Sequence, residues 1–321
     1  MKFYIVIDNN PNPTAEHLQS EHGLSIYFNS NGTNFLVDTG ASAKFALNLE
    51  TLELPDIKEI DNVIISHGHN DHTGGLKHFL QENSKAKIIL HNCIKGEKFF
   101  SCRARTATLN EWAVKEFRSI GMQQSLFIEH SHRFSEIGRA TVVSQNVTVI
   151  PTNCKNKKYP LPLGNSFLYK NDLPDDFSHE VATLVEISKE QYVVVSPCSH
   201  NGILNILHQC ANYIAFNGLK PAEVSDCKDK ETDNSLLGAR EKIVAFIGGL
   251  HYVDYLSVNA DTTKDALQEA AISATAKELA QLYPNTKVYS GHCTCKKASA
   301  QLKELLKENY SEFYSGCIIE I

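Results

Sequence analysis

The stretch VIISHGHNDHTGG, residues 63–75, decides the expected fold because it runs from an apolar strand directly into a dense set of metal-binding side chains. In extended backbone, His67 and His69 would point to the same side, where both could bind one cation through neutral ring nitrogens. Asp71 and His72 are adjacent and would diverge from that pair. They could bind a second cation close by, as in two-metal hydrolytic sites. The pattern therefore predicts a site for two metal ions at the edge of a sheet.

Strand and helix patterns extend outward from this stretch and indicate an α/β chain. Strands are expected at 3–8, 24–28, 35–38, 62–66, 87–91, 140–150, 181–187, 192–196, 243–247, 287–290 and 317–320. Helices are expected at 76–82, 109–120, 203–213, 262–283 and 296–308. In the helix at 262–283, one apolar face is expected to consist of Leu267, Ala271, Ile272, Thr275, Leu279 and Leu282.

Length and composition favour one soluble enzyme domain. The chain has 321 residues, of which 42% are hydrophobic, and it contains no apolar run near the ~18 residues that a membrane helix needs. We expect a single domain over residues 1–321, with residues 94–169 forming an elaboration over the active site, and a polar loop at 225–234.

The net charge and the cysteine content indicate which partners and which cellular compartment to expect. The net charge of −6 argues against a nucleic-acid groove, because such domains usually present a basic face. The nine cysteines are odd in number and irregularly spaced, which is typical of reduced thiols rather than of a disulfide framework. The N-terminus reads as a strand and not as a signal peptide. We therefore expect a cytoplasmic protein with a small-molecule substrate, without membrane or nucleic-acid partners, and with self-association left open.

The stretch SHGHNDHTGGL (residues 66–76) resembles the metal-binding signature of the metallo-β-lactamase superfamily. Other segments extend the resemblance along nearly the full length: EHGLSIYF (21–28), FLVDTGAS (35–42), DDFSHEVATLVEI (175–187), PCSHNGILNIL (197–207), IGGLH (247–251) and SGHCTC (290–295). Together they are similar to the subgroup labelled dihydropterin-ribofuranosyl-aminobenzene-phosphate synthase-like. The resemblance implies a four-layer αββα sandwich.

The resemblance also implies roles for residues outside the histidine loop. Asp38 would correspond to the acidic motif that orients this loop, with a turn cap as the alternative. His292 would complete the second metal site. Where most members of the superfamily carry a bridging aspartate, this chain has Cys198 and His200. Either one could supply the ligand instead, and we favour His200 because its imidazole suits zinc, iron or manganese.

Further residues have weaker assignments. His179 lies where a third histidine motif falls and could be either a ligand or a loop histidine. His251 ends a strand, where it could contact substrate or protonate a leaving group. Cys293 and Cys295 fit structural thiols better than a soft-metal site. A basic cluster could hold a phosphate, with ordinary surface charge as the alternative; it comprises Arg103, Arg105, Lys155, Lys157 and Lys158.

These assignments predict a hydrolase with two divalent cations, zinc first and iron or manganese as alternatives. His67, His69 and His200 would hold one ion, and Asp71, His72 and His292 the other. The substrate would be a small phosphoester, lactone or related ester, attacked by water that the cations activate. One alternative, implied by the subgroup, is a transferase that joins a pterin methyl-diphosphate to an arylamine ribophosphate. A second is a metal-binding sensor with vestigial activity. A flavodiiron reductase is disfavoured, because those proteins have a glutamate where this chain has His69.

Overall fold

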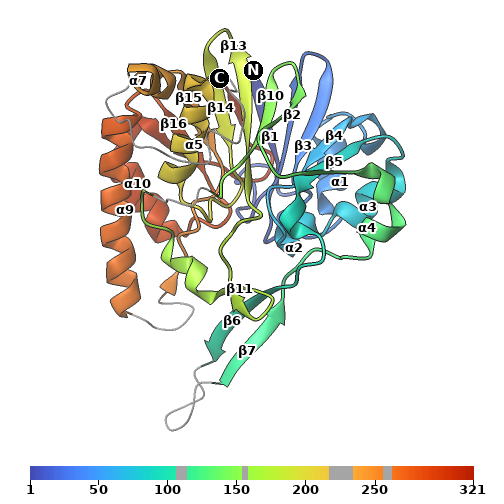
Figure 1. Cartoon of the computed structure of the whole chain (residues 1–321), viewed down its shortest axis with the longest axis horizontal. Coiled ribbons are helices and arrows are strands. Elements are labelled where there is room, and N and C mark those ends of the chain that lie inside the picture. Colours follow the sequence, from blue (N-terminus) through green and yellow to red (C-terminus); the bar gives the residue numbers. More distant parts are fainter. Residues whose placement is uncertain (106–113, 154–157, 217–233, 256–261) are drawn as a thin grey trace.

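Two seven-stranded sheets lie face to face at the centre of the molecule, and helices cover their outer faces (Figure 1). The structure is a computed structural model that describes residues 1–105, 114–153, 158–216, 234–255 and 262–321. Buried side chains form three clusters. One lies between the two sheets, and each of the other two lies between a sheet and its covering helices. The layers are therefore helix, sheet, sheet and helix, as the sequence predicted.

The first sheet has the order β18-β1-β2-β3-β4-β5-β8. Its strands are β1 (Lys2–Ile7), β2 (Ser25–Ser30), β3 (Thr33–Val37), β4 (Asn62–Ile64), β5 (Lys87–His91), β8 (Phe134–Ile137) and β18 (Ile318–Glu320). Strands β3, β4, β5 and β8 run parallel. The outer face packs against α1 (Lys44–Thr51) and α3 (Leu76–Glu82), whose buried Phe45 and Phe79 belong to the same cluster.

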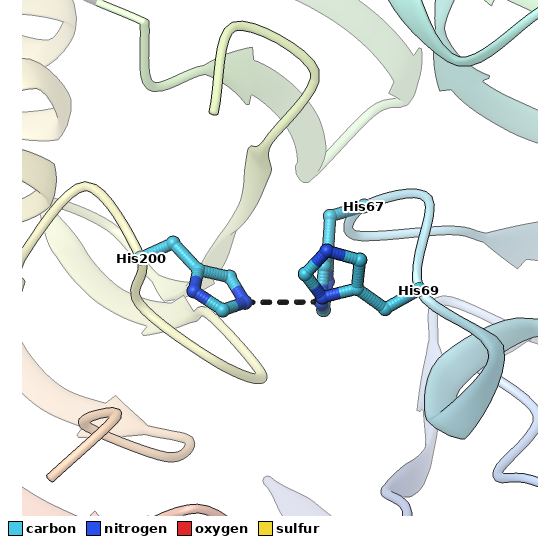
Figure 2. A group of neighbouring side chains, drawn as sticks. All are labelled: His67, His69 and His200. Atoms are coloured by element: carbon cyan, nitrogen blue, oxygen red, sulfur yellow. Dashed lines mark hydrogen bonds between the residues drawn. The ribbon is translucent and has the colours of Figure 1, made fainter. Parts of the chain in front are cut away.

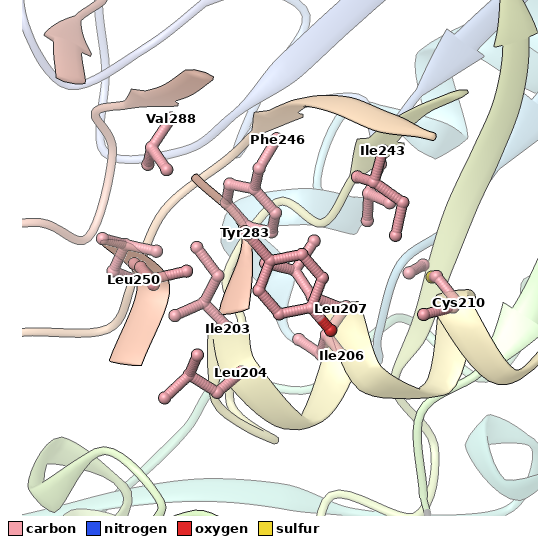
Figure 3. Packing of buried hydrophobic residues seen from close by; sticks show 14 of the residues in the cluster. Ile203, Leu204, Ile206, Leu207, Cys210, Ile243, Phe246, Leu250, Tyr283 and Val288 are labelled. Carbon is pink, nitrogen blue, oxygen red and sulfur yellow. The ribbon is translucent and has the colours of Figure 1, made fainter. Parts of the chain in front are cut away.

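The second sheet has the order β17-β16-β15-β14-β13-β10-β9. Its strands are β9 (Thr141–Ser144), β10 (Val147–Pro151), β13 (Val181–Ser188), β14 (Gln191–Val195), β15 (Ile243–Ile247), β16 (Lys287–Ser290) and β17 (Tyr310–Glu312). It is covered by α5 (Ile203–Ala215), α7 (Asn234–Glu241), α9 (Thr262–Leu282) and α10 (Lys296–Leu306). Figure 3 shows Leu207 of α5 and Phe246 of β15 in this cluster, on the side away from the first sheet.

Strand β18, the last strand in the sequence, belongs to the first sheet and pairs antiparallel with β1. The backbone N–H of Ile321 donates a hydrogen bond to the carbonyl of Met1 over 2.9 Å. Residues from both ends of the sequence therefore complete the first sheet.

A smaller four-stranded sheet, β12-β11-β6-β7, extends beyond the two main sheets (Figure 1). It consists of β6 (Phe99–Arg105), β7 (Val114–Ser119), β11 (Leu168–Lys170) and β12 (Leu173–Pro174). The expected helix at 109–120 is wrong for residues 114–119, because β7 pairs antiparallel with β6 along its whole length. Residues 109–113 lie outside the described part of the chain.

Four expected elements have the bounds that the sequence indicated: the helix at 76–82 and the strands at 87–91, 243–247 and 287–290. The expected face of α9 was partly wrong. Leu267 is 55% exposed, whereas Gln268 is buried in its place beside Ile272 and Leu279. Of the expected loop at 225–234, only Asn234 is described, and it begins α7.

Candidate metal centre

The histidine loop lies where the first sheet meets the second. It follows β4, and the carbonyl of Ser66 accepts a hydrogen bond from the backbone N–H of Val181 at the start of β13. A short helix, α2 (Asn70–Thr73), then leads to Gly74, where a Cβ atom would stand 2.1 Å from the carbonyl oxygen of Ala41. Glycine is therefore required here, because backbone would collide with any side chain.

One group of ligands consists of His67, His69 and His200, whose side chains converge from two separate loops (Figure 2). Nε2 of His200 lies 3.3 Å from Nε2 of His67. Nε2 of His69 is buried and has no hydrogen-bond partner among the described residues. All three rings are almost fully buried, so water cannot freely satisfy their nitrogens.

A second group surrounds Asp71. Its Oδ2 lies 3.6 Å from Nε2 of His72 and 3.5 Å from Nε2 of His292. The two imidazoles also face each other, with 3.0 Å between their Nε2 atoms. The ligands expected for two neighbouring ions are thus brought together in two adjoining groups.

His22, which the sequence analysis did not single out as a site residue, also adjoins Asp71. Its Nε2 lies 3.4 Å from Oδ2 of Asp71. The side-chain amide of Asn9 fixes the orientation of the His22 ring. Oδ1 of Asn9 accepts a hydrogen bond from the backbone N–H of Gly23, so Nδ2 of Asn9 must donate to Nδ1 of His22. Nε2 of the neutral ring then carries the proton. His22 is therefore an electrostatic neighbour of Asp71.

Asp38 contacts both Ser66 and His72 through its carboxylate. Its carboxylate accepts hydrogen bonds from the backbone N–H and the hydroxyl of Ser66, over 2.7 and 2.6 Å, and lies 2.7 Å from Nδ1 of His72. The Ser66 hydroxyl, whose proton goes to Asp38, lies 2.8 Å from Nδ1 of His67 and must accept from it. Both imidazoles therefore carry their proton on Nδ1 and leave a lone pair on Nε2.

The two histidines from the second half of the chain are fixed in the same tautomer. Nδ1 of His200 lies 3.0 Å from Oδ1 of Asn165, whose amide nitrogen donates to the carbonyl of His200. Nδ1 of His292 lies 3.0 Å from Oδ1 of Asn9. Asp8, at the end of β1, accepts the backbone N–H of His292 over 2.6 Å. In the first group, the Nε2 lone pairs of His67 and His200 consequently face each other.

Cys198 lies between the two groups, since its sulfur and one nitrogen each of His67 and His72 are all within 4.8 Å of one another. His200 and Cys198, the two candidates for the position of the bridging aspartate, therefore both reach the centre. His179 is engaged elsewhere. Its Nδ1 accepts the N–H of Gly68 over 3.2 Å, and its Nε2 lies 3.1 Å from Oδ2 of Asp175.

His251 also reaches the centre, with its Nδ1 3.7 Å from Sγ of Cys198 and its ring 4.2 Å from that of His200. The candidate phosphate ligands have not been brought into the site by any described contact. Arg103 and Arg105 lie in β6, but their side chains are outside the described part of the structure, as are Lys155 and Lys157.

The pKa shifts in the centre indicate which of its side chains are charged at pH 7. Burial lowers the pKa of His67 and His200 well below the usual value, and neighbouring imidazoles lower it further, so both rings are neutral at pH 7. Burial by itself would raise the pKa of Asp71. The imidazoles of His72 and His292 outweigh that effect and hold the pKa of this carboxyl well below its usual range. Burial would lower the pKa of His292, but the neighbouring Cys293 and Asp71 outweigh it and raise that pKa to about 9. Without a bound cation, the centre thus combines the neutral rings of His67 and His200 with the ion pair of His292 and Asp71.

Comparison with known proteins gives a consistent result. The profile of the family described as the Metallo-beta-lactamase superfamily matches residues 21–92, which include the histidine loop. A Methanocaldococcus jannaschii protein named 7,8-dihydropterin-6-methyl-4-(beta-D-ribofuranosyl)-aminobenzene-5'-phosphate synthase is 27% identical over 313 residues, covering 94% of this chain and 90% of that protein. An uncharacterized protein of the same organism is 21% identical over 63% of this chain and 71% of its own length.

A solved structure shares the fold. It is described as a metal-dependent hydrolase of the beta-lactamase superfamily, and it superimposes with a TM-score of 0.67 at 22% identity, covering 100% of this chain and 99% of that one. The layers, the histidine loop and these matches agree. The chain shares the fold of that structure, resembles the metallo-β-lactamase superfamily over residues 21–92, and is similar along most of its length to the dihydropterin-type synthase.

Proposed function

We propose that the chain is an enzyme that holds two divalent cations and hydrolyses a small phosphoester, lactone or related ester. The observation that carries this proposal is the approach of buried Nε2 atoms, to 3.3 Å between His67 and His200 and to 3.0 Å between His72 and His292. His67 and His200 are neutral and carry their proton on Nδ1, so their Nε2 lone pairs repel each other at this distance unless a cation lies between or beside them. The unpartnered Nε2 of His69 supports the same conclusion, because a buried nitrogen without a partner costs about 1–3 kcal/mol.

The donor set fits the cations. His67, His69 and His200 would hold one ion, while Asp71, His72 and His292 would hold the other, with Cys198 between them. Imidazole and carboxylate ligands suit zinc, and iron or manganese are alternatives. When bound, such ions polarise an electrophilic substrate and make water nucleophilic at neutral pH.

The chain's own residues prepare the site for that chemistry. Asp38 and Ser66 hold the imidazoles in one tautomer, and Asn165 does the same for His200. Burial of the rings excludes bulk water, which strengthens electrostatic interactions with a developing negative charge. His251 adjoins both His200 and Cys198 and could donate a proton to a leaving group.

A second candidate is a transferase that forms a carbon–nitrogen bond between a pterin methyl-diphosphate and an arylamine ribophosphate. It is favoured by the relative named as a synthase, because the similarity covers 94% of this chain rather than the histidine loop alone. The same donor groups would then hold the cations, whose positive charge would stabilise a departing diphosphate. Arg103 and Arg105 are the candidate residues for binding a phosphate in either reaction.

One experiment distinguishes the two reactions. The purified, metal-analysed protein is incubated in water labelled with heavy oxygen, with a panel of phosphomonoesters, phosphodiesters and lactones, and separately with a pterin methyl-diphosphate and an arylamine ribophosphate. Hydrolysis places the label in the product, whereas condensation forms a carbon–nitrogen bond and leaves the label out. Absence of bound metal, or no product in either arm from metal-loaded protein, would contradict the proposal.

A further inference from the structure

Two sulfur atoms and an imidazole meet beside the histidine centre. Sγ of Cys198 lies 3.4 Å from Sγ of Cys293 and 3.7 Å from Nδ1 of His251. The three residues follow β14, β15 and β16, which are neighbouring parallel strands, so their carboxyl ends open onto the same edge of the sheet. Residues more than 90 positions apart, such as Cys198 and Cys293, are thus brought together by the sheet itself.

The backbone before His251 can approach these sulfurs closely because residue 249 is a glycine. A Cβ atom on Gly249 would stand 2.5 Å from Sγ of Cys293 and 2.8 Å from the carbonyl oxygen of Pro197. The backbone N–H of His251 donates to Sγ of Cys293 over 3.2 Å. Such an N–H···S contact stabilises a thiolate, which is the form of cysteine that binds metals. His251 itself has φ 51°, so its backbone is held in a conformation that few residues other than glycine adopt.

The two separations from Sγ of Cys198 match those in a metal site. A tetrahedral ion with bonds of about 2.3 Å to sulfur and about 2.0–2.1 Å to nitrogen separates two sulfurs by about 3.8 Å and a sulfur from a nitrogen by about 3.6 Å. The observed separations of 3.4 and 3.7 Å differ from these values by a few tenths of an ångström. A disulfide would instead require the sulfurs to approach to about 2.05 Å.

We propose that Cys198, Cys293 and His251 bind an additional thiophilic cation, of the zinc type, next to the two ions of the histidine centre. Cys198 would be shared with the histidine centre, because its sulfur also adjoins His67 and His72. Coordination through Nδ1 leaves the proton of His251 on Nε2. Three protein ligands leave a fourth position open to solvent or substrate, as in catalytic zinc sites. This site goes beyond the proposed function, since it would exist whichever reaction the histidine centre performs.

Cobalt(II) is a suitable probe, because thiolate ligands give it a charge-transfer absorption that imidazole and carboxylate do not. The full chain is stripped of metal, kept reduced, and titrated with cobalt(II), and the bound ions are counted by elemental analysis. We expect three ions per chain and a strong thiolate band. Cys293→Ser should lose one ion and about half of the band, because one of two thiolates is removed. His251→Gln should lose the same ion and keep a weaker band.

Cys295→Ser is the matched control, because this cysteine lies two positions from Cys293 and belongs to none of the donor groups described above. It should behave as the wild type. Two ions in Cys293→Ser would also show that the variant is folded. The proposal is overturned if Cys293→Ser keeps the ion count and band of the wild type, or if thiol titration of protein purified without a reductant finds Cys198 and Cys293 in a disulfide. Wild-type protein that binds no ions would overturn the proposed function as well.

Discussion

Asp38 and His72 form a buried pair in which Oδ2 of the carboxylate lies 2.7 Å from Nδ1 of the imidazole. Asp38→Asn should weaken binding of divalent cations roughly 10–100-fold, because the amide no longer accepts both the Ser66 hydroxyl and the His72 N–H, and the tautomer of His72 is released. Asparagine tolerates the positive φ of 59° at this position, so the backbone should be retained. Competition with a chromophoric chelator measures the affinity. Asp61→Asn, near the surface, serves as the control, and equal affinity in the two variants would refute the role of Asp38.

Asp71 is the only carboxylate of the second ligand group described here, and its removal should cost one ion per chain. Asp71→Ala leaves His72 and His292 without an anion between them, so elemental analysis should find one ion fewer than in the wild type, and turnover should largely disappear. His17→Ala, which changes an exposed histidine, should retain the full content. An unchanged ion count in Asp71→Ala would remove this residue from the ligand set.

His22 should have a smaller effect than the ligands, because its exposed ring acts on Asp71 only as an electrostatic neighbour, with Nε2 3.4 Å from Oδ2 of Asp71. His22→Ala is expected to keep the ion count of the wild type but to release the second ion faster when a chelator is added. His292→Ala should lose that ion altogether. Equal losses in the two variants would make His22 a ligand in its own right.

Glu180 holds the backbone of His200 by a hydrogen bond, and this contact can be tested independently of the metal ligands. Its buried carboxylate accepts the backbone N–H groups of His200 and Asn201 over 2.7 and 2.8 Å. Glu180→Gln would turn an NH₂ group toward one of these donors, which should lower the free energy of unfolding by about 1–3 kcal/mol. Urea denaturation measures this loss. Glu186→Gln, on the strand that follows Glu180 but near the surface, should change stability little, and a similar loss there would contradict the assignment.

Two glycines should respond in opposite directions to alanine. Gly74→Ala places a Cβ atom against the backbone of Ala41, so it should cost about 1–3 kcal/mol of stability and disturb the histidine loop. Gly238 lies within α7 with no atom near its Cβ position, so Gly238→Ala should raise stability by up to about 1 kcal/mol. Thermal or urea unfolding distinguishes them. A neutral Gly74→Ala would show that the chain around Ala41 can move.

Local patterns predicted the elements whose burial is uniform. Strand β15, IVAFI, lies between a helical layer and the other sheet, so a continuous apolar run identified it with its bounds. Strand β7 was misassigned because its sequence, VKEFRS, has no clear strand period, and pairing with the distant β6 decides its conformation. In α9, Gln268 is buried because its amide donates to the carbonyl of Val253, a contact that apolar periodicity cannot reveal.

In the candidate site too, local patterns identified some residues, whereas contacts between distant segments position the others. Residues with a compact motif, such as His67 and Asp71, could be chosen from the sequence because the motif itself places them together. His22, Asn9 and Glu180 lie in segments without a metal-binding pattern, and their positions depend on how the chain ends and loops pack around the centre. The sequence therefore predicted the candidate ligands but missed most of the residues that adjoin or orient them.

The pairing of β18 with β1 has a consequence for the order in which the protein assembles. Asp8, which holds the backbone of His292, also receives its own support from Ser315, 307 residues away. During synthesis the histidine loop leaves the ribosome long before β18 exists to close the first sheet. Contacts this distant in sequence form late and slow the folding rate. The metal centre should therefore mature as one of the last events of folding, after residues 292–320 have emerged.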